Sequence, residues 1–246
     1  MDAIILCSGF GTRLGQIGSV TPKPLLLVKH KPIIEYVIDD IEKMPEVKRV
    51  IITSNMKFEK SYQEFVKRKR KAGFGKELVL VVEPVKTNEE RLGSIGSTLN
   101  AIKKAKVKDD LLLVFGDNFF NFDMRTILNE FISQRTPAIV AYDVKLPEDA
   151  KRFGVISVKN GFIDSFEEKP EKPKSTLIST GIYFYPKETL EKMTEYIRAG
   201  GPTDPAGKFI SWLVDHEKVR AIIPSKGEWV DIGNLEGHMR ARFIAK

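Results

Sequence analysis

Residues 3–28 read AIILCSGFGTRLGQIGSVTPKPLLLV, an apolar run followed by a loop rich in glycine and proline. Its apolar start, Ala3–Cys7, predicts a buried strand, because short apolar runs bounded by turn residues are typical of parallel sheets. The glycine-rich loop that follows predicts a phosphate site, since glycines directly after a strand let backbone N–H groups approach an anion closely. Two prolines then flank Lys23, and they would hold its charge in one place.

Around this stretch, apolar runs alternate with amphipathic segments through about residue 145, which is the pattern of βαβ units. The expected strands there are 49–53, 78–82, 111–115 and 138–142, and the expected helices are 32–44, 58–71, 94–104 and 124–134. Beyond residue 152, Asn160-Gly161 predicts a hairpin between strands 155–158 and 162–166. A strand at 177–185, helices from 187 and at 206–214, and a strand near 221–223 complete the list. We therefore predict the α/β class, with a predominantly parallel, mixed sheet, its later part partly antiparallel, and helices on both faces.

Composition narrows the class of protein. The 246 residues are enough for one large α/β domain, and their formal net charge of +7 suits a protein that handles polyphosphate anions. Cys7 is the one cysteine, so no intramolecular disulfide can form, and it is expected in the core. The N-terminus lacks the pattern of a signal peptide, and no apolar run is long enough to span a membrane. We expect a cytoplasmic protein that binds neither a membrane nor nucleic acid, with the basic run 67–71 as a solvated helix end.

Two other phosphate-binding motifs fit the glycine loop poorly. A dinucleotide-binding fold would need a third glycine where Leu14 stands and an acidic residue near Asn55, at the end of the second strand. A Walker A loop would need Gly-Lys-Ser/Thr at a fixed spacing, which is absent from the sequence. An NAD-dependent dehydrogenase is therefore disfavoured.

The compound motif resembles a known family. Residues 9–14 (GFGTRL) and 21–25 (TPKPL) are similar to the N-terminal signature of the sugar-1-phosphate nucleotidyltransferases, which include glucose-1-phosphate thymidylyltransferases and mannose-1-phosphate guanylyltransferases. The resemblance implies an enzyme that transfers a nucleoside monophosphate from a nucleoside triphosphate to a sugar 1-phosphate and releases pyrophosphate. It also implies one Rossmann-like nucleotidyltransferase domain over 1–246, with a nucleotide-binding part (1–145) and a sugar-phosphate-binding part (146–246).

The same resemblance implies the residues of the nucleotide site. Arg13 and Lys23 would be catalytic, because they neutralise charge on the triphosphate. The nucleotide-binding set would be Leu6, Ser8, Gly9, Gly11, Thr12, Arg13, Lys23, Glu83 and Gly93.

Later motifs, in family order, imply a metal and a sugar site. Asp117 follows an apolar strand in Gly-Asp-Asn, and Asp231 lies in residues 229–233 (WVDIG). Both would bind Mg²⁺, which takes carboxylates together with phosphate oxygens. The sugar 1-phosphate would be bound by residues in three further motifs, namely Gly154, Glu168, Lys169, Thr180 and Gly181.

Several alternatives stay open in the sequence. Glu83 stands where thymidylyl- and uridylyltransferases carry a glutamine that reads the base, and a carboxylate would suit guanine or cytosine better. Loop 84–92 looks longer than usual, so Glu89 or Glu90 could be the equivalent residue. A cytidylyltransferase acting on phosphocholine or another phospho-alcohol, or a non-catalytic subunit that binds nucleotide-sugars, would keep the fold. Exposed apolar surface at the sheet edge or on the last helix could support a homodimer.

Overall fold

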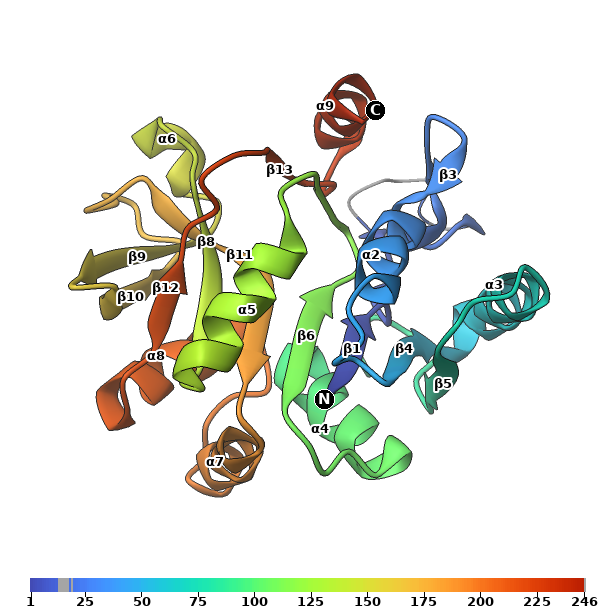
Figure 1. Ribbon diagram of the computed structural model, residues 1–246, viewed down its shortest axis with the longest axis horizontal. Coiled ribbons are helices and arrows are strands. Elements are labelled where there is room, and N and C mark those ends of the chain that lie inside the picture. Colours follow the sequence, from blue (N-terminus) through green and yellow to red (C-terminus); the bar gives the residue numbers. More distant parts are fainter. Residues whose placement is uncertain (13–17, 19, 246) are drawn as a thin grey trace.

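The structure is a computed structural model that describes residues 1–12, 18 and 20–245. The described strands include a nine-stranded sheet in the order β5-β4-β1-β6-β11-β8-β12-β10-β9 (Figure 1). Its first half is parallel and consists of β1 (Asp2–Leu6), β4 (Arg49–Asn55), β5 (Glu77–Glu83) and β6 (Leu111–Phe115). These strands are nearly continuous apolar runs, as expected for strands that are covered on both faces.

The second half of the sheet is mixed. It contains β8 (Ala138–Asp143), β9 (Gly154–Lys159), β10 (Phe162–Glu168), β11 (Leu177–Tyr185) and β12 (Arg220–Ile222). Strand β11 runs antiparallel to both β6 and β8, so it joins the two halves into one sheet. The β9–β10 hairpin turns at Asn160 and Gly161, whose φ angles are 53° and 80°, as a type I′ turn requires. The expected mixed sheet is confirmed.

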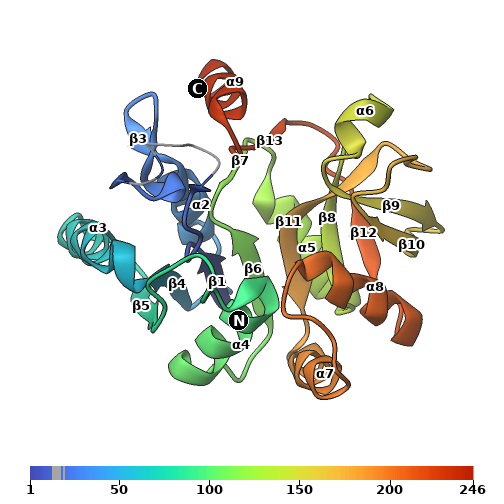
Figure 2. The same ribbon diagram turned by 180° about the vertical axis from the view of Figure 1, so that it is seen from behind.

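Helices cover both faces of the sheet, as predicted. Helices α2 (Ile33–Glu42), α3 (Glu59–Lys71) and α5 (Met124–Gln134) pack in one core cluster with Ala3 and Ile5 of β1. Helices α4 (Gly93–Ala105), α7 (Lys187–Arg198) and α8 (Ala206–His216) pack in the other cluster with Ile4. Successive residues of β1 therefore serve opposite cores, which is the two-residue period of a strand. Figure 1 shows α2 and α5 in front of the sheet. Figure 2, the view of the opposite face, shows α4 and α8 in front of it.

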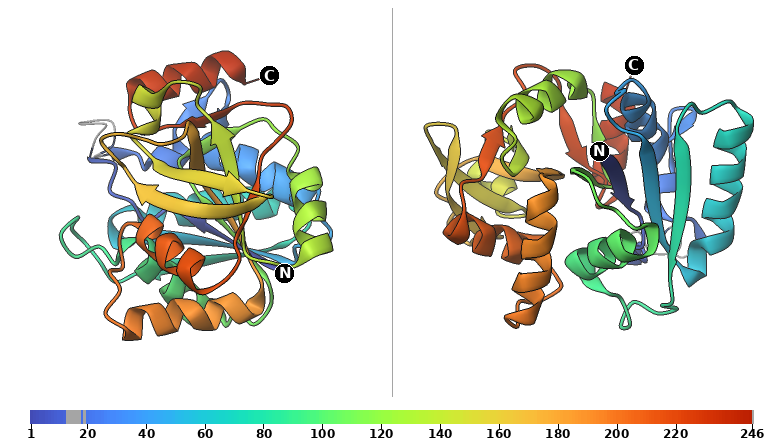
Figure 3. Two further views of the ribbon diagram at one scale, coloured as in Figure 1. Left: turned by 90° about the vertical axis from the view of Figure 1, so that its left-hand side faces the viewer. Right: turned by 60° about the horizontal axis from the view of Figure 1, so that its bottom comes forward.

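Every strand and helix that the sequence predicts is present, with ends within two residues of the expected ones. The ten-residue helix α9 (Leu235–Ile244) was missed. Elements of two to four residues were missed as well: β2 (Leu27–Val28), β3 (Lys31–Pro32), β7 (Asn118–Phe120), β13 (Trp229–Asp231), α6 (Pro147–Ala150), and the 3₁₀ turns η2 (Lys23–Leu25) and η3 (Met56–Phe58). Strand β7 pairs with β13 in a two-stranded sheet of their own. Figure 3 (left) shows α9 above the β9–β10 hairpin and α8 below it.

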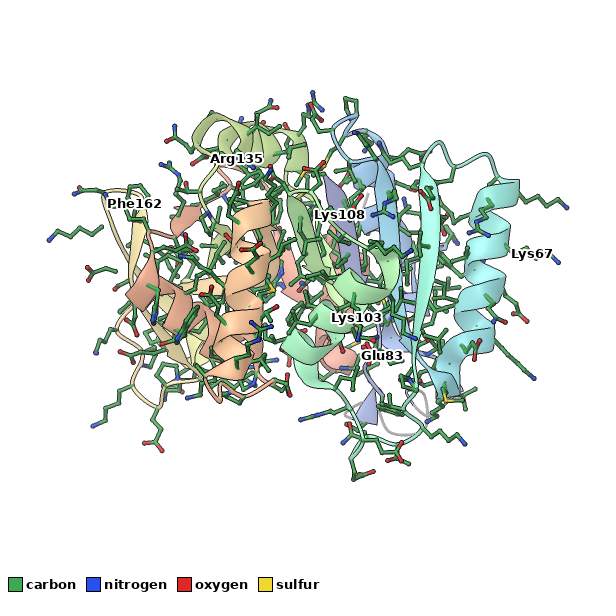
Figure 4. All side chains as sticks on the ribbon, turned by 90° about the horizontal axis from the view of Figure 1, so that it is seen from below. Lys67, Glu83, Lys103, Lys108, Arg135 and Phe162 are labelled. Atoms are coloured by element: carbon green, nitrogen blue, oxygen red, sulfur yellow. The ribbon has the colours of Figure 1, made fainter. Side chains whose placement is uncertain are left out.

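The basic run 67–71 is only partly solvated, so that expectation was wrong in part. Lys67 lies on the outer side of α3 (Figure 4). Lys69, in contrast, is 9% exposed and forms ion pairs with Glu35 and Asp39 of α2. Arg70 donates to the carbonyl oxygen of Leu78. Within the described residues, no helix is both long and apolar enough to cross a bilayer.

Candidate functional site

A cavity of about 260 Å³ opens where β1 and β6 end, at the carboxyl edge of the parallel half of the sheet. Ligands of open α/β sheets bind at this edge, because the loops after successive strands converge there. Eight of the predicted site residues line it, namely Leu6, Ser8, Gly9, Gly11, Thr12, Lys23, Gly93 and Asp117. Arg13 lies outside the described residues. One cavity is therefore lined by the end of the first strand, by the glycine loop, and by residues 88–94, which lie more than 75 residues further along the chain.

The glycine loop gives this cavity an open, polar wall. Gly11 has a φ of +67°, and a Cβ there would lie 3.1 Å from the carbonyl oxygen of Gly18. A Cβ at Gly9 would meet no atom of the described residues within 4 Å, so these residues leave the backbone uncovered at that point. Uncovered N–H groups after a strand are suited to bind phosphate oxygens.

Lys23 is restrained by its backbone, by burial and by a hydrogen bond of its side chain. Pro22 precedes it and Pro24 follows it in the short 3₁₀ turn η2, and the residue is 8% exposed. Its Nζ donates to the carbonyl oxygen of Gly233 at 3.3 Å. This bond connects the wall of the cavity to the segment directly after Asp231. A fixed positive charge at this place can neutralise phosphate oxygens without reorganisation.

The β7–β13 pair brings the segments that carry the two predicted metal-binding aspartates together. Asp117 directly precedes β7, and Asp231 is the last residue of β13, where it is opposite Asn118 in the register. The N–H of Ile232 donates to the carbonyl oxygen of Asp117 at 3.0 Å. Asp117 lines the large cavity, and Asp231 lines a separate, smaller one of about 130 Å³. Among the described residues, no group of three or more His, Cys, Asp or Glu could hold a metal by itself. Two carboxylates fit Mg²⁺ nonetheless, because this ion takes its other ligands from water and substrate phosphates.

The predicted sugar-phosphate residues lie in the second half of the sheet. Gly154 starts β9 and pairs directly with Glu168, at the end of β10. Burial raises the pKa of the Glu168 carboxyl, which lies 3.8 Å from the Nζ of Lys169. Gly181 packs against the segment that carries Asp117. A Cβ at Gly181 would lie 2.9 Å from the amide nitrogen of Asn118 and 3.1 Å from the ring of Phe115.

Two of the predicted residues, Thr180 and Glu83, have buried side chains, and their binding roles stay predictions. The Thr180 hydroxyl is buried and donates to the carbonyl oxygen of Val140 at 2.7 Å, so it is used within the sheet. Glu83 is 1% exposed and lies beside α4 (Figure 4), and it does not line the cavity. Burial raises the pKa of its carboxyl, and the hydroxyls of Ser8 and Ser97, which do line the cavity, act in the opposite direction. Among the described residues, its Oε1 has no hydrogen-bond partner.

Neither of the two alternative base readers lines the cavity. The Glu90 carboxylate accepts hydrogen bonds from the backbone N–H groups of Lys86 and Thr87, so it folds its own loop. Glu89 is exposed and does not line the cavity.

Sequence reasoning missed Asn118 and Asp204. Asn118 is 3% exposed, and its Oδ1 accepts from the indole N–H of Trp229, while its Nδ2 has no partner among the described residues. An unpartnered buried donor beside Asp117 and Gly181 is suited to bind a substrate hydroxyl. Its position in the Gly-Asp-Asn motif was the available signal. Asp204 lines the cavity from a loop that carries no recognisable pattern.

Comparisons with known proteins agree with this geometry. Residues 2–244 match the model of the nucleotidyl transferase family. The chain is 32% identical over 237 residues to the bifunctional protein GlmU of Methanocaldococcus jannaschii, covering 95% of this chain and 51% of that protein. It is 34% identical over 192 residues to the D-glycero-alpha-D-manno-heptose 1-phosphate guanylyltransferase of Campylobacter jejuni, covering 76% of this chain and 77% of that one.

A solved structure is similar over the whole chain. It comes from Bacillus anthracis, is described as a glucose-1-phosphate thymidylyltransferase in complex with a sucrose, and superimposes with a TM-score of 0.84 at 27% identity. The superposition covers 100% of this chain and 95% of the Bacillus anthracis chain. The chain spans about half the length of the GlmU relative that it matches. Because the family match runs through the glycine loop, the segments that carry both aspartates and α9, this chain belongs to the nucleotidyl transferase family, among the sugar-1-phosphate nucleotidyltransferases.

Proposed function

We propose that this chain transfers a nucleoside monophosphate from a nucleoside triphosphate to a sugar 1-phosphate, giving an NDP-sugar and pyrophosphate. One arrangement carries the proposal: the glycine loop and Lys23 line the same cavity as Asp117, whose backbone is bonded to the segment that carries Asp231. The named relatives act on different sugars and different bases, so they support the reaction class and leave the substrate pair to experiment. A cytoplasmic location stays a prediction.

The reaction needs no covalent enzyme intermediate. An oxygen of the sugar phosphate attacks the α-phosphorus in line, and a new P–O bond forms while the bond to the leaving pyrophosphate breaks. The backbone N–H groups of residues 9–12 and the Lys23 ammonium would bind the triphosphate and stabilise the charge that develops on pyrophosphate. Arg13, next to this loop, would add a planar pair of donors.

Asp117 and Asp231 would hold Mg²⁺ between the two substrates. When bound there, the ion would supply positive charge at the phosphates. Asp231 ends β13 and Asp117 directly precedes β7, and these two strands pair, so the backbones of both aspartates are fixed before the substrates bind. Lys23, whose Nζ is bonded to Gly233, connects this pair to the triphosphate wall.

On the sugar side, Glu168 would accept hydrogen bonds from sugar hydroxyls and Lys169 would bind the phosphate. The Lys169 side chain is 62% exposed and is therefore available to an anion. Gly154 and Gly181 would contribute through their backbones, because Phe166 and Asn118 fill the space that a Cβ would take at these two positions. Thr180 would contribute through its backbone and shape, because its hydroxyl is already bonded to Val140.

A pyrophosphate-release screen tests the proposed function. It crosses ATP, CTP, GTP, UTP and dTTP with the 1-phosphates of glucose, mannose, galactose and N-acetylglucosamine, with and without Mg²⁺. We expect release to require one triphosphate, one sugar phosphate and the ion. If pyrophosphate is released with phosphocholine and a triphosphate but with none of the sugar phosphates, the acceptor substrate is a phospho-alcohol and not a sugar 1-phosphate. Tight binding of an NDP-sugar without any turnover would instead indicate a regulatory subunit.

Glu83→Gln is expected to stabilise the protein at neutral pH by an amount on the order of 1 kcal/mol, the usual size for one buried polar group. Burial raises the pKa of Glu83, so the folded chain holds this proton to a higher pH than the unfolded chain does. Stability is therefore lost as pH rises from the ordinary range of a glutamate through the raised pKa. Glutamine has no proton to lose, so the gain should vanish below about pH 4.

Denaturant unfolding at several pH values checks this prediction. The matched control is Glu77→Gln, at the exposed start of the same strand β5. An equal gain in free energy of unfolding at pH 4 and pH 8 would show that the ionisation of Glu83 is not the cause. The triphosphate preference of the variant, taken from the screen, then reports separately on whether residue 83 takes part in reading the base.

We further propose that the chain pairs through α9. Leu235, Met239 and Phe243 are 59%, 58% and 91% exposed, and their spacing of four residues puts them in one stripe along the helix. Ala241, on the opposite side, is fully buried. Two antiparallel copies of α9 would bury this stripe and bring Glu236 of one copy near Arg240 of the other, as a two-fold interface requires.

Analytical ultracentrifugation checks the pairing. The wild-type chain is expected to sediment as a dimer, and Phe243→Glu is expected to sediment as a monomer because it places a charge in the stripe. Ile132→Glu, at a 47% exposed position of α5, is the matched control and should stay dimeric. A monomeric wild-type protein would overturn the proposal.

A further inference from the structure

The loop before α8 provides the N-terminal cap of α4 from the other half of the sheet. Helix α4 begins at Gly93, and the preceding Leu92 provides no side-chain cap. Instead, the Asp204 Oδ1 accepts from the Ser94 backbone N–H at 3.1 Å and from its hydroxyl at 3.0 Å. The next N–H, of Ile95, donates to the carbonyl oxygen of Thr203 at 2.9 Å. Unpaired N–H groups at a helix start require such partners, and here the partners are 110 residues away in sequence.

The docking at this point is close. Gly93 has a φ of +76°, and a Cβ there would lie only 2.6 Å from the Thr203 carbonyl oxygen. The Asp204 Oδ2 also forms an ion pair with Arg91 at 3.2 Å. Gly93, Ser94 and Asp204 all line the large cavity. The position of loop 203–204 therefore determines the position of the backbone that forms this wall of the nucleotide site.

The same segment reaches the sugar side within three residues. Helix α8 starts at Ala206, and its second residue, Gly207, packs so closely on the Glu168 carboxylate that a Cβ would collide with it. The charge of Asp204 is one of the causes that raise the pKa of Glu168, after burial. Residues 203–207 thus touch α4 at one end and the predicted sugar-binding carboxylate at the other.

We propose that Asp204 is a positioning residue that couples the two substrate sites. A sugar phosphate that binds at Glu168 and Lys169 fixes the first turn of α8. Through the hydrogen bonds of Asp204, this also fixes Gly93 and Ser94, which line the nucleotide cavity. Coupling of this kind is reciprocal, so each substrate raises the affinity of the other by the same factor. This inference rests on the proposed function, because it needs both substrates to bind.

Two variants separate the cap from a general structural role. Asp204→Ala removes the cap, whereas Asp204→Asn keeps an oxygen that accepts from Ser94 and loses only the charge that faces Arg91. Hydrogen exchange in the ligand-free chain is the first readout. We expect the Ser94 amide to exchange about tenfold faster or more in Asp204→Ala, and close to the wild-type rate in Asp204→Asn. Amides of α3, which is remote from this loop, provide the internal control.

Calorimetric titration measures the coupling itself. The α,β-methylene analogue of GTP, which cannot release pyrophosphate, is titrated with and without saturating mannose 1-phosphate, or with the pair that the screen selects. We expect the sugar phosphate to lower the Kd of the analogue at least about fivefold in the wild type and in Asp204→Asn, within the usual range of such couplings. In Asp204→Ala the factor should fall to about one.

The outcomes are distinguishable from a failure of the proposed function. Wild-type coupling in a folded Asp204→Ala protein would overturn the inference while the activity stands. An uncoupled wild-type enzyme that still releases pyrophosphate would overturn it as well. A wild-type chain that binds no sugar phosphate and releases no pyrophosphate would remove the proposed function, and the coupling with it.

Discussion

Replacing Lys23 by alanine is expected to lower kcat by about 10²–10³-fold, the usual cost of removing one preorganised donor from a site of developing charge. The side chain lies in the cavity wall and is 8% exposed, between two prolines that restrict its backbone. A charge that is already in place when the pyrophosphate leaves stabilises the transition state more than the ground state. The loss should therefore be larger in kcat than in KM for the triphosphate.

Variants at the same position separate charge from structure. Because the Lys23 Nζ also donates to the Gly233 carbonyl, its loss could loosen the segment beside Asp231. Lys23→Met keeps the length of the side chain without the charge, and it should lose as much activity as Lys23→Ala. Lys23→Arg keeps the charge, and it should recover part of the activity. The matched control is Lys103→Ala, an exposed position in the last turn of α4, which should keep wild-type kinetics.

Steady-state kinetics and thermal unfolding are measured on the same preparations. A folded Lys23→Ala protein with the wild-type kcat would remove Lys23 from the mechanism. A loss of activity in proportion to a loss of folded protein would assign to Lys23 a structural role only.

The nucleotide half of the site could be predicted because its residues are close in sequence. The glycine loop, Lys23 and the end of the first strand fall within residues 3–25, and all described members of this set line one cavity. The strands that flank them are long apolar runs, whose period is visible in the sequence alone. Local chemistry of this kind does not depend on how distant parts of the chain pack.

The rest of the site depends on long-range contacts that leave no local pattern. Strands β7 and β13 have three residues each, too few to show a period, and each is a strand only because of the other. Asp204 caps a helix 110 residues away, and nothing in its own loop indicates this. The sequence placed Glu83 at the right strand end, but which way its side chain lies depends on Ser8 and Ser97, which arrive from other elements. Helix α9 was missed because it carries apolar residues on its outer as well as its inner side.

The second large effect is expected at Asp117 and Asp231. Asp117→Asn and Asp231→Asn should each lower kcat by about 10²–10⁴-fold, because each variant removes one of the two carboxylate charges that we propose attract Mg²⁺. Asparagine has nearly the same shape as aspartate, so the β7–β13 pairing and the bond from Ile232 to residue 117 should persist. Raising the Mg²⁺ concentration should restore part of the activity of either single variant, since weaker binding of the ion can be offset by mass action.

The double variant is the sharper test. If both carboxylates act through one ion, removing the second carboxylate after the first lowers kcat only slightly further. The double variant should then be nearly as active as the less active of the two single variants. Two independent roles would instead multiply the two losses, and this result would separate the aspartates. Asp164→Asn, at an exposed position of β10, is the matched control for removing a carboxylate charge. Because Asp117 and Asp231 are joined by backbone pairing and not by chain continuity, strong non-additivity between them would also be direct support in solution for the small sheet that the sequence did not indicate.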